Sequence, residues 1–247
     1  MQYELFSLDE IEPFFRIYQS QDTAKQKLTM YKVNNRTLDL IVYKSKTGEL
    51  FLAEGYDYYF SLYNSNRKID VLCRVGEYKS ELEVRYAALR ELLLSNSRWA
   101  LKMNQFSILI NQYNQKQRQI ADKLGIPVEK VTKYLLDEDI PTKIRILACK
   151  YDLGRIANKI ARSTLLPRYK EIMYEFVTYP KEHSLRINDG IFNRARLLLR
   201  QDSNVDKLSN DDIRNLIIRH AVEQKKRAIE NFQYDLDMML KNAKATG

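Results

Sequence analysis

The segment QRQIADKLGIPVEKVTKYL, residues 117–135, carries the strongest structural signal in this sequence of 247 residues. Its apolar residues fall where two helices joined by a tight turn need an inner face: Ile120, Ala121, Leu124, Ile126, Val131 and Leu135. Ala121 is small where the helices must cross closely, and Gly125 suits a left-handed turn. Pro127 can begin the second helix because its φ is already fixed. The pattern predicts a helix-turn-helix centred on residues 115–137.

A helix-turn-helix binds duplex DNA by placing its second helix in the major groove, where the early residues face base edges. The residues expected on that outward face are Val128, Glu129, Lys130, Thr132 and Lys133. Lys133 can reach guanine and Glu129 can accept a hydrogen bond from cytosine. Val128 or Thr132 can touch a thymine methyl group. The alternative interpretation is a helical hairpin that only packs.

Further DNA contacts are expected at the start of the first helix and along it. The residues concerned are Lys116, Gln117, Arg118 and Lys123. The three cations among them suit contacts to phosphate, which position a protein on DNA without reading its sequence.

A second basic group follows in the segment RIANKIARSTLLPRYK, residues 155–170. Arg155, Lys159 and Arg162 are spaced by four and three residues, which places them along one stripe of a helix. The stripe predicts further contacts to the DNA backbone. The alternative is a solvated helix face.

The overall composition agrees with a polyanionic partner. The chain has 41 Lys and Arg against 32 Asp and Glu, a formal net charge of +9, which favours nucleic acid first and an anionic membrane surface second. No apolar run is long enough to span a membrane, and the N-terminus does not resemble a signal peptide, so we expect a cytoplasmic protein. The two cysteines and two histidines are too scattered for a metal site, and we expect no metal and no catalytic residues.

The periodicity changes along the chain. Residues 1–80 show strand-like runs at 38–43, 49–53 and 69–75, with a helical aromatic face within 55–64 between the last two. Beyond residue 80 the pattern is helical. We therefore expect an α+β chain with three parts. These are a small mixed α/β domain at 1–80, a helical domain with the helix-turn-helix at 81–180, and a helical C-terminal segment at 181–247 that could form a dimer interface through residues 213–240.

In the order of these segments, the chain resembles the ParB partition-protein family over about residues 5–150. LFSLDEIEP, residues 5–13, is similar to the opening strand and the LxxI-P segment of that family. Residues 38–75 resemble its nucleotide-binding core, and the helix-turn-helix has a similar place. YLLDEDIP, residues 134–141, resembles the step that follows the family's reading helix.

The resemblance implies a homodimer that binds a palindromic site on double-stranded DNA. In the family this activity serves plasmid or chromosome partition, often beside a partition ATPase. Related branches are transcriptional regulators of plasmids or phages. Many members bind and slowly hydrolyse CTP, which closes the dimer as a clamp.

One motif departs from the family. Its phosphate-gripping sequence aligns with residues 54–59, where Gly55 is kept but Tyr58 replaces the arginine and Asp57 replaces a basic neighbour. A phenol and a carboxylate do not neutralise phosphate as a guanidinium does. The next phosphate segment is matched at best by Ser95-Asn96-Ser97-Arg98. We expect CTP binding to be lost or much weakened, and no cofactor. The alternative class is an enzyme, either a CTP-switched clamp or a ParB-like nuclease.

Overall fold

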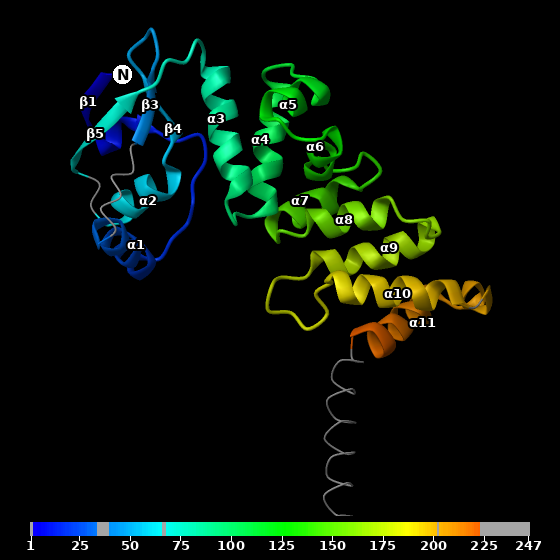
Figure 1. The fold of residues 1–247 in the computed structure, drawn as a ribbon. Coiled ribbons are helices and arrows are strands. Elements are labelled where there is room, and N and C mark those ends of the chain that lie inside the picture. The colour runs from blue at the N-terminus through cyan, green and yellow to red at the C-terminus, as the bar shows by residue number, and fades with distance from the viewer. Residues whose placement is uncertain (1, 34–39, 66–67, 202, 223–247) are drawn as a thin grey trace, which may run out of the picture. The chain divides into compact units, whose positions relative to one another are not determined.

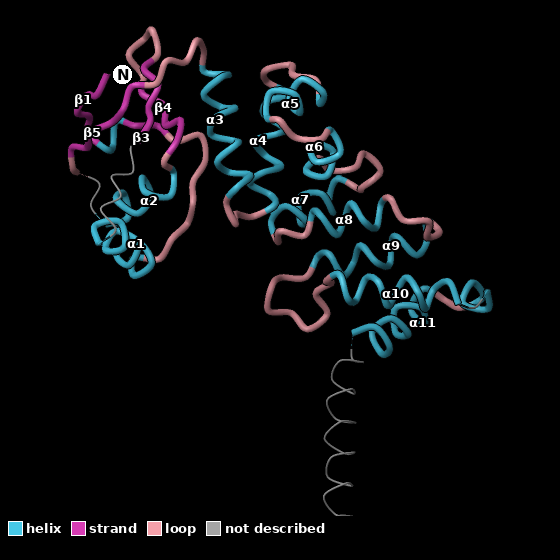
Figure 2. Tube along the Cα trace, in the orientation of Figure 1, coloured by secondary structure: helices cyan, strands magenta, loops and turns pink. Residues whose placement is uncertain are grey.

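The structure is a computed structural model that describes residues 2–33, 40–65, 68–201 and 203–222. The chain forms two compact units, Met1–Leu135 and Leu136–Gly247. Figure 2 shows that strands occur in the first unit, whereas the described part of the second unit consists of helices and loops. The fold is therefore α+β. The division expected at residues 80 and 180 stays a prediction, because packing does not test which segments fold independently.

A five-stranded sheet organises the first unit, with strand order β1-β5-β3-β4-β2. The strands are β1 (Gln2–Ser7), β2 (Ile11–Glu12), β3 (Leu40–Lys44), β4 (Leu50–Glu54) and β5 (Asp70–Val75). β1 pairs antiparallel with β5 and β3 with β4, while β3 and β5, like β2 and β4, run parallel. The three strand-like runs seen in the sequence correspond to β3, β4 and β5. The opening strand is β1.

Helix α2 (Tyr56–Ser65) joins β4 to β5 and buries three of the four aromatic side chains of the face expected from the sequence, while Tyr63 is half-buried. Tyr56, Tyr59 and Phe60 are at most 4% exposed. The Tyr56 hydroxyl donates to the carbonyl oxygen of Leu52, and the Tyr59 hydroxyl donates to that of Ile11. These side chains are structural. Helix α1 (Gln21–Val33), which the sequence analysis did not anticipate, packs against α2.

Helix α3 (Glu81–Leu94) lies against β4 and is capped by Ser80, whose hydroxyl accepts a hydrogen bond from the Glu83 amide. A small apolar cluster forms there, in which Val84 packs with Ile41 and Phe51. The cluster attaches α3 to the sheet.

The rest of the first unit consists of α4 (Trp99–Asn111), α5 (Gln117–Leu124) and α6 (Val128–Tyr134). These helices share one apolar core with the sheet and α2. Figure 1 shows α5 and α6 beside α4, and α6 packs on α4 while α5 packs on α3.

The second unit has its own core, built by helices that mostly begin where the sequence places a proline or a cap. The helices are α7 (Thr142–Lys150), α8 (Gly154–Ala161), α9 (Pro167–Glu175), α10 (Asp189–Gln201) and α11 (Asn210–Ile217). Pro141 precedes α7, and the Ser209 hydroxyl caps α11 by accepting from the Asp212 amide. Ile213 and Ile217 are fully buried in this unit's core. The remainder of the expected C-terminal stripe, from residue 223 on, lies outside the described residues.

Candidate nucleic-acid interface

Two short helices joined at Gly125 occupy the segment for which the sequence predicts a helix-turn-helix. Gly125 follows α5 with φ 66° and ψ 38°, the left-handed conformation. The Ile126 amide then donates to the carbonyl oxygen of Ala121 at 3.0 Å, which closes the end of α5. A Cβ added at Gly125 would meet no atom within 4 Å. Backbone conformation, and not space, therefore explains why glycine suits this position.

The inner face of the helix pair is apolar, as the pattern requires. Ile120, Ala121 and Val131 are at most 1% exposed, and Leu124 is 6% exposed. These side chains belong to the core cluster that also contains Phe106 of α4. The pair is therefore fixed to the first unit through its inner face, which leaves the opposite face to solvent.

Two side chains from other helices hold the C-terminal ends of the pair. Arg90 of α3 donates from Nη2 to the carbonyl oxygen of Lys123 at 3.0 Å. Trp99 of α4 donates from Nε1 to the carbonyl oxygen of Lys133 at 3.2 Å. The last carbonyls of a helix lack partners within it, so each donor completes one. Sequence reasoning missed both, because they come from residues far from the motif.

The outer face carries the residues predicted to touch DNA. All of them are exposed except Thr132, which is half-buried: Lys116, Gln117, Arg118, Lys123, Val128, Glu129, Lys130 and Lys133. The Thr132 hydroxyl shares its one proton between two acceptors. These are Oε1 of Gln117, at 3.0 Å, and the carbonyl oxygen of Val128, at 3.1 Å. Thr132 is thus placed to hold Gln117 and is less available for a base than its sequence position suggested.

The cations of this face are unneutralised within the part of the chain that the structure describes. None of Lys116, Arg118, Lys123, Lys130 and Lys133 forms an ion pair with a described residue. The acids between Lys116 and Lys133 are Asp122 and Glu129. Five cations against two carboxylates leave a local positive field on an exposed, rigidly supported surface.

The second basic group differs in this respect. Arg155 and Lys159 lie exposed on α8 and Arg162 lies exposed just after it, but each pairs with a carboxylate of the second unit. Asp189 binds both Arg155 and Lys159, and Asp137 binds Arg162 at 3.1 Å. Hydrogen bonds from Lys159 and Arg155 hold the pKa of the Asp189 carboxyl below its usual value. The stripe is therefore largely neutralised by its own unit.

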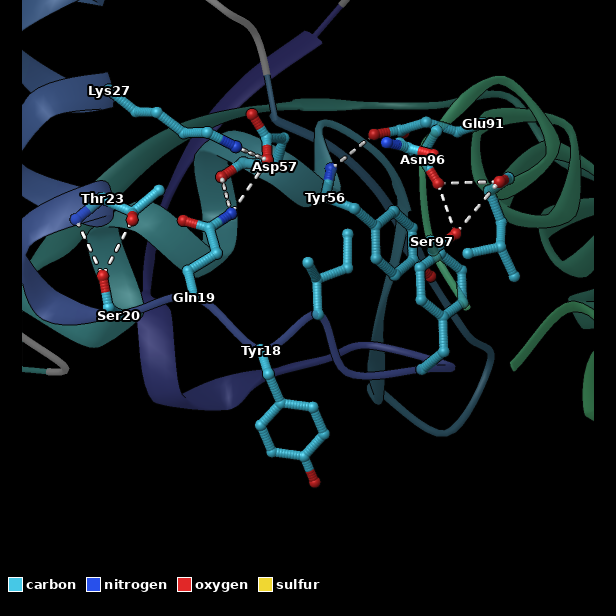
Figure 3. A pocket seen from close by; sticks show the side chains of 14 residues that line it. Tyr18, Gln19, Ser20, Thr23, Lys27, Tyr56, Asp57, Glu91, Asn96 and Ser97 are labelled. Carbon is cyan, nitrogen blue, oxygen red and sulfur yellow. Dashed lines mark hydrogen bonds and ion pairs between the residues drawn. The ribbon is translucent and has the colours of Figure 1, made fainter. Parts of the chain in front are cut away.

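A pocket of about 440 Å³ lies at the N-terminal end of α2 (Figure 3). It is lined by residues that precede α1, by α1 and α2, and by the C-terminal end of α3 with Ser95, Asn96 and Ser97. Lys27 is the only cation among the described residues of the lining, and it pairs with Asp57. Gln19 also donates to Asp57, at 2.8 Å.

The residues present do not fit a nucleoside triphosphate. The amides of Gly55 and Tyr56 donate to the two carboxylate oxygens of Glu91, at 2.8 and 2.9 Å, so the donors that would meet phosphate are already used. Burial raises the pKa of the Glu91 carboxyl above its usual value, and the hydrogen bonds from these two amides offset only part of that rise. Neither Tyr58 nor Arg98 is among the described lining residues.

Two further observations concern other kinds of site. Among the described residues, no group of three or more His, Cys, Asp or Glu side chains could hold a metal ion. None of the helices in the described ranges has the length and apolar character of a membrane span.

Comparison with known proteins gives matches among solved structures. No family model and no curated protein matches the chain. The chain is similar to the C-terminally truncated chromosome-partitioning protein ParB from Caulobacter crescentus complexed to the centromeric parS site, with 11% identity over 87% of this chain and 99% of that one and a TM-score of 0.40. It is also similar to that protein complexed with CTP-gamma-S, with 14% identity over 66% of this chain and 94% of that one and a TM-score of 0.30.

Proposed function

We propose that this chain binds double-stranded DNA through a helix-turn-helix formed by α5 and α6. The observation that carries the proposal is the set of five exposed cations on these helices that have no ion-pair partner among the described residues. Leaving such charges unpaired on a firmly held surface is expected when a polyanion supplies the counter-charge.

In the proposed complex, α6 enters the major groove and α5 crosses the backbone. Lys133 donates to a guanine edge, and Glu129 accepts from a cytosine amino group. Val128, 36% exposed at the start of α6, packs against a thymine methyl group. Thr132 positions Gln117 through its hydrogen bond, so the free amide nitrogen of Gln117 can donate to phosphate or to a base.

The backbone contacts come from the remaining cations of the pair. Lys116, Arg118 and Lys123 on and before α5 contact phosphate, and Lys130 supports them from α6. Arg155, Lys159 and Arg162 form a secondary backbone contact, which must displace Asp189 and Asp137. Exposed ion pairs are weak, so their displacement by phosphate is feasible.

The biological role that we propose follows from the resemblance to the ParB family. The chain acts in the cytoplasm as a homodimer on a palindromic site, either as a partition factor beside an ATPase or as a transcriptional regulator, on a plasmid, a phage genome or a chromosome. A palindrome is the expected site of a two-fold symmetric reader.

The first experiment is the selection of bound duplexes from sheared genomic DNA at physiological salt, followed by sequencing. We expect one recurring palindrome, and the genes beside it would distinguish partition from regulation. Recovery of random fragments would contradict sequence-specific reading. It would favour the alternative that α5 and α6 form a helical hairpin that only packs.

A further inference from the structure

The N-terminal end of α2 is already occupied by an anion from within the chain. The first amides of a helix have no intrahelical partner and attract negative charge. At α2 the carboxylate of Glu91 supplies the missing partner: its two oxygens accept hydrogen bonds from the amides of Gly55, at 2.8 Å, and Tyr56, at 2.9 Å. Figure 3 shows Glu91 reaching toward Tyr56 at the edge of the pocket.

The geometry of this contact depends on backbone and packing on both sides. Gly55 has φ 90°, a backbone conformation that residues other than glycine rarely adopt. This conformation places its amide beside that of Tyr56. Glu91 lies one residue before Leu92, which is 1% exposed and fixed in the core. The carboxylate is thus held by α3 in the position where an external anion would bind α2.

The other charges of the pocket strengthen this arrangement. Asp57 is bound by Lys27 and by Gln19, so the lining ammonium group is committed to a carboxylate. With Asp57 and Glu91 against Lys27, the described lining carries more negative than positive charge. A triphosphate entering here would meet two carboxylates and would have to displace one of them from the amides that it needs.

We propose that Glu91 is a built-in anion that closes the phosphate-accepting end of α2, so that this pocket excludes nucleoside triphosphates. The resemblance to the ParB family implies a CTP-binding pocket in this part of the chain, and the residues present contradict that implication. The contact then serves to fasten α3 to the N-terminal end of α2.

The test is isothermal titration calorimetry of the full chain with magnesium and either CTP or inorganic triphosphate, at low salt and without DNA. The wild-type chain should give only a weak, non-saturating binding heat with either ligand. Glu91→Ala uncovers both amides and removes a charge, so it should bind inorganic triphosphate at least roughly tenfold more tightly than the wild type. Glu91→Gln keeps the length and one acceptor oxygen but loses the charge, and its gain should be smaller.

The control is Glu77→Ala, which removes an exposed carboxylate outside the pocket lining and should leave triphosphate binding as weak as in the wild type. Circular dichroism establishes that each variant is folded, and Glu91→Gln serves if Glu91→Ala is not. Micromolar binding of CTP by the wild type would overturn the proposal, as would a folded Glu91 variant with no gain. Because no DNA is present, either outcome is independent of the proposed DNA binding.

Discussion

The indole nitrogen of Trp99 donates a hydrogen bond of 3.2 Å to the main-chain carbonyl oxygen of Lys133, 34 residues further along the chain. Its ring also lies near that of Tyr134, with 6.4 Å between the ring centroids. Through these contacts α4 fixes the C-terminal end of α6, the helix proposed to read bases. The orientation of α6 therefore depends on a residue outside the helix-turn-helix segment.

Trp99→Phe should destabilise the chain by about 1 kcal/mol, because it keeps an aromatic ring but removes the donor to a helix carbonyl. The free energy of unfolding, measured with urea, reports this loss. Tyr18→Phe is a suitable control, since Tyr18 is 87% exposed and should lose almost nothing. Equal stability of the wild type and Trp99→Phe would contradict a structural role for this hydrogen bond.

Trp99 should also report DNA binding by its fluorescence, since it is the only tryptophan in the sequence. A bound duplex beside α6 would change the polarity around the indole, and we expect a shift of its emission that saturates with the bound fraction. Anisotropy of a labelled duplex gives an independent binding curve. If binding is seen by anisotropy but the emission does not change, the duplex lies away from the end of α6.

Lys133→Ala and Arg118→Ala should have different effects on DNA binding. Lys133→Ala should cost about 1–3 kcal/mol on the preferred duplex and less on a scrambled one, because it removes a base contact. Arg118→Ala should weaken both duplexes alike and reduce the slope of log affinity against log salt by about 1, because it removes a phosphate contact. Equal losses on both duplexes for Lys133→Ala would contradict its role in base reading.

Gly125→Ala should destabilise the chain by roughly 1–2 kcal/mol, because the residue is held at positive φ while the added methyl group meets no atom. DNA affinity should fall as well, since the turn sets the two helices relative to each other. Gly48→Ala is a matched control: Gly48 also has positive φ and open space, but it lies between β3 and β4. It should lose similar stability and keep its DNA affinity.

Asp189→Asn should lower stability at neutral pH by less than about 1 kcal/mol, because Asp189 is 38% exposed and its ion pairs are screened. The pKa of Asp189 is lower in the folded chain, chiefly through the hydrogen bond from Lys159. The carboxylate therefore contributes stability above its unfolded pKa of about 4 and loses it as the pH falls through the folded value. The difference between variant and wild type should shrink below about pH 4.

The same substitution tests the secondary backbone contact. Asp189→Asn frees Arg155 and Lys159 from their shared partner, so duplex binding should tighten at low salt and the salt slope should steepen. Unchanged affinity would place this stripe outside the DNA interface, without affecting the role proposed for α5 and α6.

Much of the fold could be predicted because its signals are local. The alternation in residues 69–75, the aromatic spacing of α2 and the inner face of α5 and α6 each reflect a periodicity within one element. The glycine at residue 125 likewise marks a backbone conformation that few other residues adopt. Helix α1, in contrast, was not predicted from the sequence.

The sequence by itself determined the order β3, β4, α2 and β5, the turn at Gly125 and the outward position of the basic side chains of α5 and α6, since neighbours a few residues apart decide them. Only the tertiary structure decided which of the basic side chains form ion pairs. Asp189 reaches Arg155 across 34 residues, and Glu91 reaches the amide of Gly55 across 36. Such pairs form when separate helices pack, and no local periodicity encodes them. The unpaired positive charge that we propose for DNA binding, and the contact of Glu91 with the N-terminal end of α2, are therefore properties of the packed chain.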